Sequence, residues 1–246
     1  QGVPSYLLLL NLMKCRDKPK LEESELIEIC SLLTRFFVRR NLTDMPPTRD
    51  LTRLFIRIIE ETDDEGLKGS DLVTGIRARL AGVSASDIIF EEKLRGPIYE
   101  SNPDTARFIL ATLAKPSVTK EMKGLWDRYE SGSYVWTIEH VFPQGKNIPA
   151  SWVDMIADGN EEKAEEIQGK YVHTLGNLTL TGYNSTLGNL SFKEKKNRKD
   201  KSGNEVGYLN GLNINSGIAI HDAWTLDDIT ARTDKLVPDV LDLFIL

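Results

Sequence analysis

The chain has 246 residues, of which 40% are apolar, 8% aromatic and 28% charged. This composition is sufficient for a buried core and excludes a generally disordered chain. The 31 basic and 37 acidic side chains give a formal net charge of −6, whereas a basic chain is the first expectation for a protein that binds nucleic acid.

From Val3 to about Lys115, apolar residues recur at intervals of three and four, which predicts a helical first half. The clearest apolar stripes predict one helix from Leu21 to Arg40 and another from Pro47 to Glu61. Further helices are predicted at Asp71–Ala81, Ser86–Leu94 and Pro103–Ala114, each after a Ser or Asn that can cap it. We therefore expect a helical bundle domain over residues 1–120.

The sequence changes character after Pro116. The run Tyr134–Ile138 is rich in β-branched and aromatic residues and predicts a strand, which ends in Glu139-His140. A polar helix capped by Asn160 is expected next, and then a second strand over Asn177–Thr181.

The rest of the chain again predicts helices. The segment from Tyr183 to Lys201 is helical in composition, and Ser191 with Glu194 makes a plausible capping box. A last helix is expected from Thr225 to Leu246, capped by Thr225 with Asp228 and bent or interrupted at Pro238. The predicted fold class is mainly α, with a helical bundle followed by a second domain over residues 121–246 that contains a two-stranded hairpin.

Cysteine and membrane patterns narrow the class of protein. The two cysteines, Cys15 and Cys30, both lie in apolar helix-like stretches, which favours neither a disulfide framework nor a cysteine zinc site. The longest apolar run, Tyr6–Leu10, is far shorter than the roughly 20 residues needed to cross a bilayer. We expect a cytoplasmic protein without a membrane partner. Because the chain starts at Gln1 without an initiator Met, we also expect a piece of a longer protein.

Two of the three histidines, His140 and His173, lie in the same β-containing region. His140 is placed at the end of a predicted strand, where a side chain can face a cleft. A histidine that merely caps a strand end would give the same pattern, and spacing alone leaves both interpretations open.

The order of elements favours a metal site. A strand ending in Glu139-His140, a second strand with Asn177 and a helix carrying Asn184 match a β-hairpin with a helix packed across it. A neutral imidazole can take a proton from water, while a metal stabilises the charge that develops on phosphate. Glu139 and the Asn184 amide oxygen are suitable ligands for a hard cation such as Mg²⁺.

The ordered motifs carry a family resemblance. They are Thr137-Ile138-Glu139-His140-Val141-Phe142-Pro143-Gln144, then His173-Thr174-Leu175-Gly176-Asn177-Leu178-Thr179-Leu180, then Tyr183-Asn184, and finally Gly188-Asn189-Leu190-Ser191-Phe192 with Lys195-Lys196. Together they resemble an HNH, or ββα-metal, nuclease domain. More narrowly, the sequence is similar to the carboxy-terminal nuclease domain of GmrSD-type modification-dependent restriction enzymes and of the related phosphorothioate-sensing defence nuclease SspE.

The resemblance implies residue roles. His140 would be the general base, and Glu139 beside it a metal ligand. Asn177 would be the catalytic-site asparagine that pins the loop between the strands, and Asn184 the helix residue that completes the metal site, a role for which Asn189 competes. His173 belongs to the subfamily pattern, but whether it touches metal, phosphate or only the hairpin stays open. Glu replaces the Asp, and Asn the His, found in many HNH enzymes.

A basic segment follows the predicted metal site. Between Lys193 and Lys201 six basic residues and two acidic ones sum to +4. Such a run is usually a solvated helix face, but its place after the motif makes it a candidate for DNA phosphate contacts. The candidate DNA-binding residues are Lys193, Lys195, Lys196, Arg198 and Lys199.

The leading hypothesis is a DNA endonuclease domain, dependent on Mg²⁺ or Mn²⁺, that nicks or cuts DNA in a restriction or anti-phage system. The family implies an amino-terminal nucleotide-hydrolysing sensor domain as partner, and no P-loop motif for it occurs in the sequence. Pairing of two copies stays open. The alternative is a non-catalytic helical module with an HNH-like remnant that binds DNA or protein. Acid–base hydrolysis by the Glu-rich stretch 161–166 is a third, weaker hypothesis.

Overall fold

The computed structural model describes residues 2–14, 21–115 and 124–246. The fold is mainly helical, with 64% helix and one two-stranded antiparallel sheet, which confirms the predicted fold class. The chain divides into two compact units, one of residues 1–91 with 241–246 and the other of residues 92–240. The domain boundary near residue 120 stays a prediction. Cys30 is an exposed free thiol, whereas Cys15 lies outside the described residues.

The first unit contains helices α1 (Tyr6–Lys14), α2 (Glu23–Thr43), α3 (Thr48–Asp64) and α4 (Gly69–Val83). The predicted stripes are buried: Phe36 of α2 and Phe55 of α3 meet edge to face, with ring centroids 6.2 Å apart. Aromatic pairs in this geometry add to the free energy of apolar burial. The hydrophobic pattern of the sequence therefore places α2, α3 and α4 within a few residues of their predicted bounds.

Helix α5 (Asp87–Arg95) is the next element, and the division between the units falls within it. The helices that follow are α6 (Ile98–Ser101), α7 (Pro103–Ala114), α8 (Ala150–Ala157), α9 (Glu161–Tyr171), α10 (Asn184–Leu187), α11 (Phe192–Lys196), α12 (Asn213–Ala219) and α13 (Leu226–Leu243). Two predicted caps are confirmed. The Asn102 side chain accepts a hydrogen bond from Thr105 N at the start of α7, and Asn160 accepts one from Lys163 N at the start of α9.

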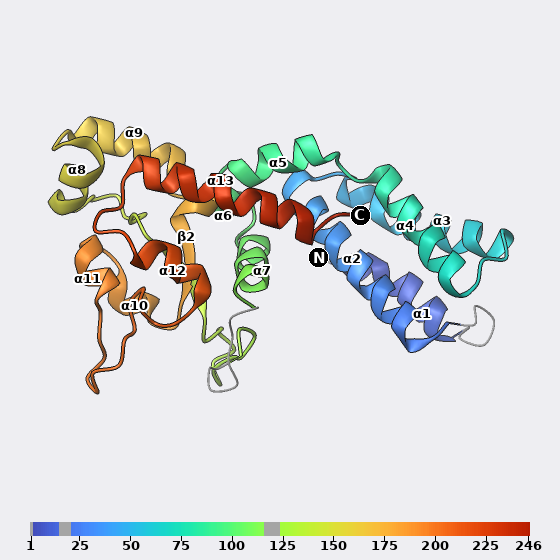
Figure 1. Ribbon diagram of the computed structural model, residues 1–246. Coiled ribbons are helices and arrows are strands. Elements are labelled where there is room, and N and C mark those ends of the chain that lie inside the picture. Colours follow the sequence, from blue (N-terminus) through green and yellow to red (C-terminus); the bar gives the residue numbers. More distant parts are fainter. Residues whose placement is uncertain (1, 15–20, 116–123) are drawn as a thin grey trace. The chain divides into compact units, whose positions relative to one another are not determined.

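The sheet consists of β1 (Thr137–His140) and β2 (Leu178–Thr181), which pair antiparallel with Glu139 opposite Thr179 and His140 opposite Leu178. β1 begins three residues later than predicted and β2 one residue later. Strand β2 contacts α7 and α12 (Figure 1). The short helix α10 contacts β1. A hairpin with a helix against its first strand is therefore present.

Two predicted helical segments can be compared with the structure in detail. The segment from Tyr183 to Lys201 contains two short helices, because Gly188 adopts a positive φ of 37° and separates α10 from α11. Ser191 then caps α11 through the predicted capping box with Glu194. Helix α13 has the predicted Thr225–Asp228 cap. It runs through Pro238 to Leu243, so of the two alternatives predicted there the interruption is wrong, and the bend stays a prediction.

A separate apolar core holds the second unit together. Trp152 of α8, Phe192 of α11 and Trp224 are fully buried in it, and the Phe192 and Trp224 rings stack with centroids 5.9 Å apart. This core fixes the start of α11, because Phe192 is the first residue of that helix. Among the described helices, none has both the length and the apolar character needed to cross a bilayer.

Candidate active site

His140, the last residue of β1, is buried against two other ring side chains. Its Nε2 lies 3.1 Å from Nδ1 of His173, so one ring donates a hydrogen bond to the other. The Tyr99 ring meets His140 edge to face at 4.6 Å and stacks on His173 at 5.3 Å. The structure thus brings together the two histidines that are 33 positions apart in the sequence, and adds Tyr99, which no sequence motif indicated.

The surroundings of His140 keep its imidazole neutral. Burial, together with the nearby His173 and Lys195, lowers the pKa of His140 to about 3. Burial also lowers the pKa of His173. Removing a charged imidazole from water is unfavourable unless an acid compensates it, and in the described residues the partner of His140 is another histidine. Both rings are therefore available as neutral hydrogen-bonding groups at neutral pH.

Glu139 is buried beside Lys195. Because successive side chains of a strand point to opposite faces, the Glu139 side chain leaves β1 on the face opposite to that of His140. Lys195 Nζ lies 2.6 Å from Glu139 Oε1, and the Tyr208 hydroxyl donates to the same oxygen at 3.5 Å. Burial raises the pKa of Glu139 and lowers that of Lys195, while the attraction within the ion pair opposes both shifts. Both known bonds use Oε1, which leaves Oε2 as the oxygen for a further ligand.

The expected surface role of Lys195 is wrong. Its side chain is fully buried, and besides Glu139 it donates to the carbonyl oxygens of His140 at 2.8 Å and Val141 at 3.1 Å. All three N–H groups of the ammonium therefore have acceptors, as a buried cation requires. Lys195 follows the core residue Phe192 by three positions, which places both on one helix face, and this spacing is the signal that could have revealed its burial.

Asn177 lies just before β2 and is fully buried. Its Oδ1 accepts from Phe142 N at 2.8 Å and from Trp224 Nε1 at 3.3 Å. Its Nδ2 donates to the carbonyl oxygens of Phe142 at 3.0 Å and Val172 at 2.9 Å. The side chain ties the segment after β1 to the segment before β2, which is the place expected for a loop-pinning asparagine.

Asn184, at the start of α10, is attached to β1. Its Nδ2 donates to the Ile138 carbonyl oxygen at 2.7 Å, so its amide oxygen points away from that carbonyl. Asn189, the competing residue, is exposed in the turn between α10 and α11. Of the two asparagines, the structure joins Asn184 to the strand that carries Glu139 and His140.

The other basic candidates differ in how they are held. Lys196 donates to the His221 carbonyl oxygen at 2.7 Å and lies 3.3 Å from Asp222. Lys199 pairs with Glu205 at 2.6 Å. Lys193 and Arg198 are exposed, so these two are the most accessible cations of the predicted set.

Sequence reasoning also missed Arg232 of α13, which is buried. Its Nη1 donates to the carbonyl oxygens of Gly176 and Leu178, each at 2.7 Å, and its Nη2 donates to that of Ile214 at 3.1 Å. The guanidinium therefore holds α13 and α12 against the start of β2. An arginine surrounded by helix-type sequence gives no signal for such a role.

Comparison with known protein families identifies the family to which the chain belongs. The family described as GmrSD restriction endonucleases, C-terminal domain, matches residues 84–238. The chain belongs to this family. The matched stretch contains the hairpin, α10 and every site residue named above. No curated protein matches the chain significantly. Membership in a family of restriction endonuclease domains indicates nuclease activity.

The metal that such a nuclease domain implies can be compared with the donor atoms present. In residues 2–14, 21–115 and 124–246, no three His, Cys, Asp or Glu side chains are grouped as a metal site would require. Mg²⁺ commonly takes only one or two protein oxygens and keeps several waters. Glu139 Oε2 and Asn184 Oδ1 are oxygen donors of the type that a hard cation prefers, although the Glu139 carboxylate is already paired with Lys195 through Oε1.

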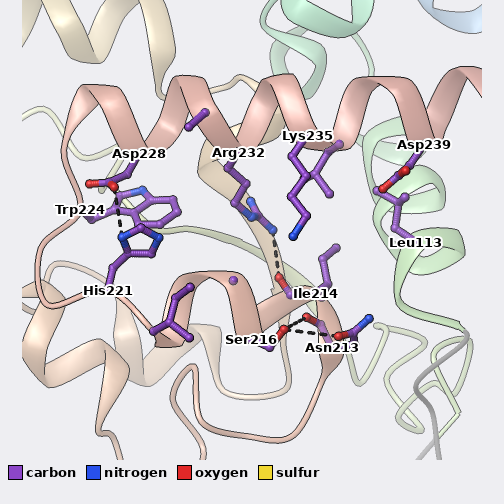
Figure 2. A pocket seen from close by; sticks show the side chains of 14 residues that line it. Leu113, Asn213, Ile214, Ser216, His221, Trp224, Asp228, Arg232, Lys235 and Asp239 are labelled. Carbon is purple, nitrogen blue, oxygen red and sulfur yellow. Dashed lines mark hydrogen bonds and ion pairs between the residues drawn. The ribbon is translucent and has the colours of Figure 1, made fainter.

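A pocket of about 300 Å³ is lined by α12, α13 and part of α7 in the same GmrSD-type domain. Figure 2 shows His221 and Trp224 on one side of it and Lys235 extending into it from α13. His221 Nδ1 lies 3.1 Å from Asp228. None of the predicted site residues is among those that line this pocket. Its walls include Trp224, which donates to Asn177 Oδ1, and Arg232, which donates to the Leu178 carbonyl oxygen at the start of β2.

Proposed function

We propose that the chain is an HNH-type nuclease domain that hydrolyses DNA phosphodiester bonds, as part of a modification-dependent restriction or antiviral defence enzyme. One observation carries the proposal: Asn184 of α10 is bonded to β1, the strand that ends in Glu139-His140. A hairpin with a helix against its first strand is the arrangement in which a base and a metal can lie on the two sides of one phosphate.

In this mechanism His140 is the general base. The His140 ring is neutral, and His173 orients it through the hydrogen bond between His140 Nε2 and His173 Nδ1. This leaves His140 Nδ1 to receive the proton of the attacking water. A base with so low a pKa takes the proton only when negative charge lies close by, and a bound phosphodiester supplies that charge. The role of His173 is to position the ring, following the logic of a base held by a third group.

Mg²⁺ or Mn²⁺ would be held by Glu139 Oε2 and Asn184 Oδ1. When bound, the cation supplies a Lewis acid that stabilises charge on the phosphate and on the leaving oxygen. Lys195 fixes Glu139 and the end of β1 in place, since it bonds both the carboxylate and two carbonyls of that segment. Asn177 keeps the loop between the strands in register with them.

DNA would be contacted by the exposed cations Lys193 and Arg198, and by Lys196 and Lys199 of the same segment. Phosphate contacts of this kind position the DNA without reading its sequence. Delivery to modified DNA would depend on an amino-terminal nucleotide-hydrolysing sensor domain of the parent protein, in the cytoplasm. Whether two copies act together decides between nicking and cutting both strands.

The test is plasmid nicking in the presence of Mg²⁺ or Mn²⁺ by the His140→Ala variant, with His221→Ala as the matched control. The His221 side chain is paired with Asp228 and has no role in the proposed mechanism, so its loss should leave nicking intact. We expect His140→Ala to lower the nicking rate by at least about 100-fold, the usual contribution of a general base. Undiminished nicking would refute the assignment.

The buried Glu139–Lys195 pair specifically favours a second candidate, a non-catalytic module that binds DNA or protein. An ammonium already satisfies the carboxylate that a metal would need. Calorimetric titration with Mn²⁺ distinguishes the two, because the module should take up no metal at millimolar concentration. In the nuclease, Glu139→Gln and Asn184→Ala should each weaken metal binding.

A further inference from the structure

An aromatic hairpin, defined here as residues 124–136, leads directly into β1. Arg128 and Tyr134 pair across it as an antiparallel bridge, and Val135 N donates to the Asp127 carbonyl at 2.9 Å. The buried Arg107 of α7 holds both of its ends. It donates to the carbonyl oxygens of Leu125 at 2.5 Å and Trp136 at 3.1 Å. The aromatic hairpin is therefore fixed to α7.

Cations and aromatic rings alternate through the aromatic hairpin. The guanidinium carbon of Arg107 lies 3.4 Å from the Tyr134 ring centroid, and that of Arg128 lies 3.7 Å from it. Two guanidinium groups this close to one ring must lie on its opposite faces. Arg107 is also 5.0 Å from the Trp126 ring centroid, and Phe108 is 5.4 Å from Trp126. One side of the indole is thus packed on α7.

The other side of Trp126 faces solvent. Its exposed fraction is 48%, and that of its neighbour Tyr129 is 49%, whereas Trp152 and Trp224 are almost fully buried. The covered side of the indole packs on α7, whereas the exposed side is left available to a partner. A rigid ring, half covered and half exposed beside Arg128, has the features of a platform on which a nucleobase can stack.

We propose that the aromatic hairpin binds the DNA strand, with an unpaired base stacked on Trp126 and Arg128 contacting the adjacent phosphate. The proposal rests on the proposed nuclease function for the choice of DNA as partner. Trp136 is followed immediately by β1, and the four residues of β1 span about 13 Å at roughly 3.3 Å per residue. A strand bound at the aromatic hairpin can therefore continue to His140.

The charges around the platform suit this partner. Asp127 accepts a hydrogen bond from Gly124 N within the turn, so its carboxylate is used locally. The positive charges of Arg107 and Arg128 together exceed the negative charge of Asp127. Glu130 at the tip is the remaining acidic residue of the aromatic hairpin. Removing the Glu130 charge should therefore strengthen binding, whereas removing the Arg128 charge should weaken it.

The experiment uses the full chain in EDTA, so that no cleavage takes place. A fluorescein-labelled oligothymidine of about 20 nucleotides, a length that covers one binding site of this kind, is titrated at low salt and followed by anisotropy. Trp126→Ala is compared with Trp126→Phe, which keeps an aromatic face. Tyr6→Ala is the matched control, because Tyr6 of α1 is an aromatic side chain with an exposed fraction of 59% outside the aromatic hairpin.

We expect Trp126→Ala to weaken binding by about 5-fold to 100-fold, the loss typical of one stacked base. Trp126→Phe should retain most of the affinity, Arg128→Ala should lose several-fold, Glu130→Gln should gain, and Tyr6→Ala should match the wild type. Intrinsic tryptophan fluorescence of the wild type should be quenched on binding, and that of Trp126→Phe should not.

Equal affinity of Trp126→Ala, Tyr6→Ala and wild type would overturn the proposal, as would a wild type that does not bind the oligonucleotide. The two proposals fail separately. If His140→Ala still nicks plasmid but Trp126→Ala binds weakly, the catalytic assignment is wrong and the aromatic hairpin stands. If His140→Ala is inactive but Trp126→Ala binds normally, the nuclease stands and the role of the aromatic hairpin is wrong.

Discussion

Replacement of Lys195 by Met tests the buried network that supports the hairpin. The side chains of Lys195 and Glu139 have exposed fractions of only 1% and 3%. The variant removes the cation but keeps the approximate volume of the side chain. It leaves a buried carboxylate without its partner and takes a donor from the His140 and Val141 carbonyls.

The expected loss follows from this geometry. Breaking a buried ion pair by removing one partner costs about 3–5 kcal/mol, because the remaining charge is uncompensated. Glu139→Gln leaves the ammonium in the same position and should cost a similar amount. The double variant, Glu139→Gln with Lys195→Met, contains no buried charge, so its loss should be smaller than the sum of the two single losses by about 2 kcal/mol or more.

The pH dependence has a definite sign. Burial raises the pKa of Glu139, and without Lys195 only the hydrogen bond from Tyr208 opposes this shift. A group whose pKa is higher in the folded state than in the unfolded state favours folding at low pH and disfavours it as the pH rises. The loss caused by Lys195→Met should therefore shrink when the pH is lowered from 7 towards 5.

Urea unfolding followed by tryptophan fluorescence measures these free energies. All four tryptophans, Trp126, Trp136, Trp152 and Trp224, lie in the unit of residues 92–240, so the signal reports on the unit that contains the network. A loss below about 1 kcal/mol for Lys195→Met at pH 7 would show that the pair is exposed in solution. Additive single losses would show that the two side chains do not interact.

Three further predictions concern the same unit. His140→Gln should flatten the pH dependence of stability. The pKa of His140 is about 3 in the folded state and about 6.5 in the unfolded state, so this residue lowers the free energy of unfolding of the wild type by about 2 kcal/mol at pH 5. An equal change in the free energy of unfolding of both proteins between pH 7 and pH 5, measured in urea, would contradict this. Asn177→Ala leaves buried backbone groups of Phe142 without partners and should lower the free energy of unfolding, measured by thermal unfolding, by about 2–4 kcal/mol. A decrease of less than about 1 kcal/mol would contradict this prediction. Gly176→Ala places a Cβ against the Ile229 carbonyl and should lower the free energy of unfolding by more than about 3 kcal/mol or prevent folding. The control Gly169→Ala, in open space on α9, should raise it by about 0.5–1 kcal/mol. Equal melting temperatures for the two variants would refute the packing at Gly176.

Helices were predictable where packing and capping act within a short stretch of sequence. The apolar stripes of α2 and α3, the Asn102 cap of α7 and the Thr225–Asp228 cap of α13 all depend on residues only a few positions apart. These are the interactions that periodicity and capping rules describe. The early start predicted for β1 has a different cause: Tyr134 has strand-type character but packs between Arg107 and Arg128 in the aromatic hairpin, and Arg107 is far away in the sequence.

The candidate site was predictable as a set of motifs, but its contacts were not. The order of Glu139-His140, Asn177 and Asn184 indicated a hairpin and a helix, and the structure has both. The contact between His140 and His173 depends on how Tyr99 and the loop before β2 pack, which no short motif encodes. The roles assigned to these residues in catalysis remain predictions.

The basic segment shows why formal charge is a poor guide to surface charge. Its +4 sum counts Lys195, which is buried against Glu139, and Lys199, which pairs with Glu205. Lys196 is likewise held near Asp222. The accessible positive charge is therefore well below the formal value, on a chain whose net charge is −6. If the domain binds DNA as proposed, the counterion-release contribution should be small, and a contact that does not depend on charge, such as the proposed base stacked on Trp126, should contribute proportionally more to the affinity.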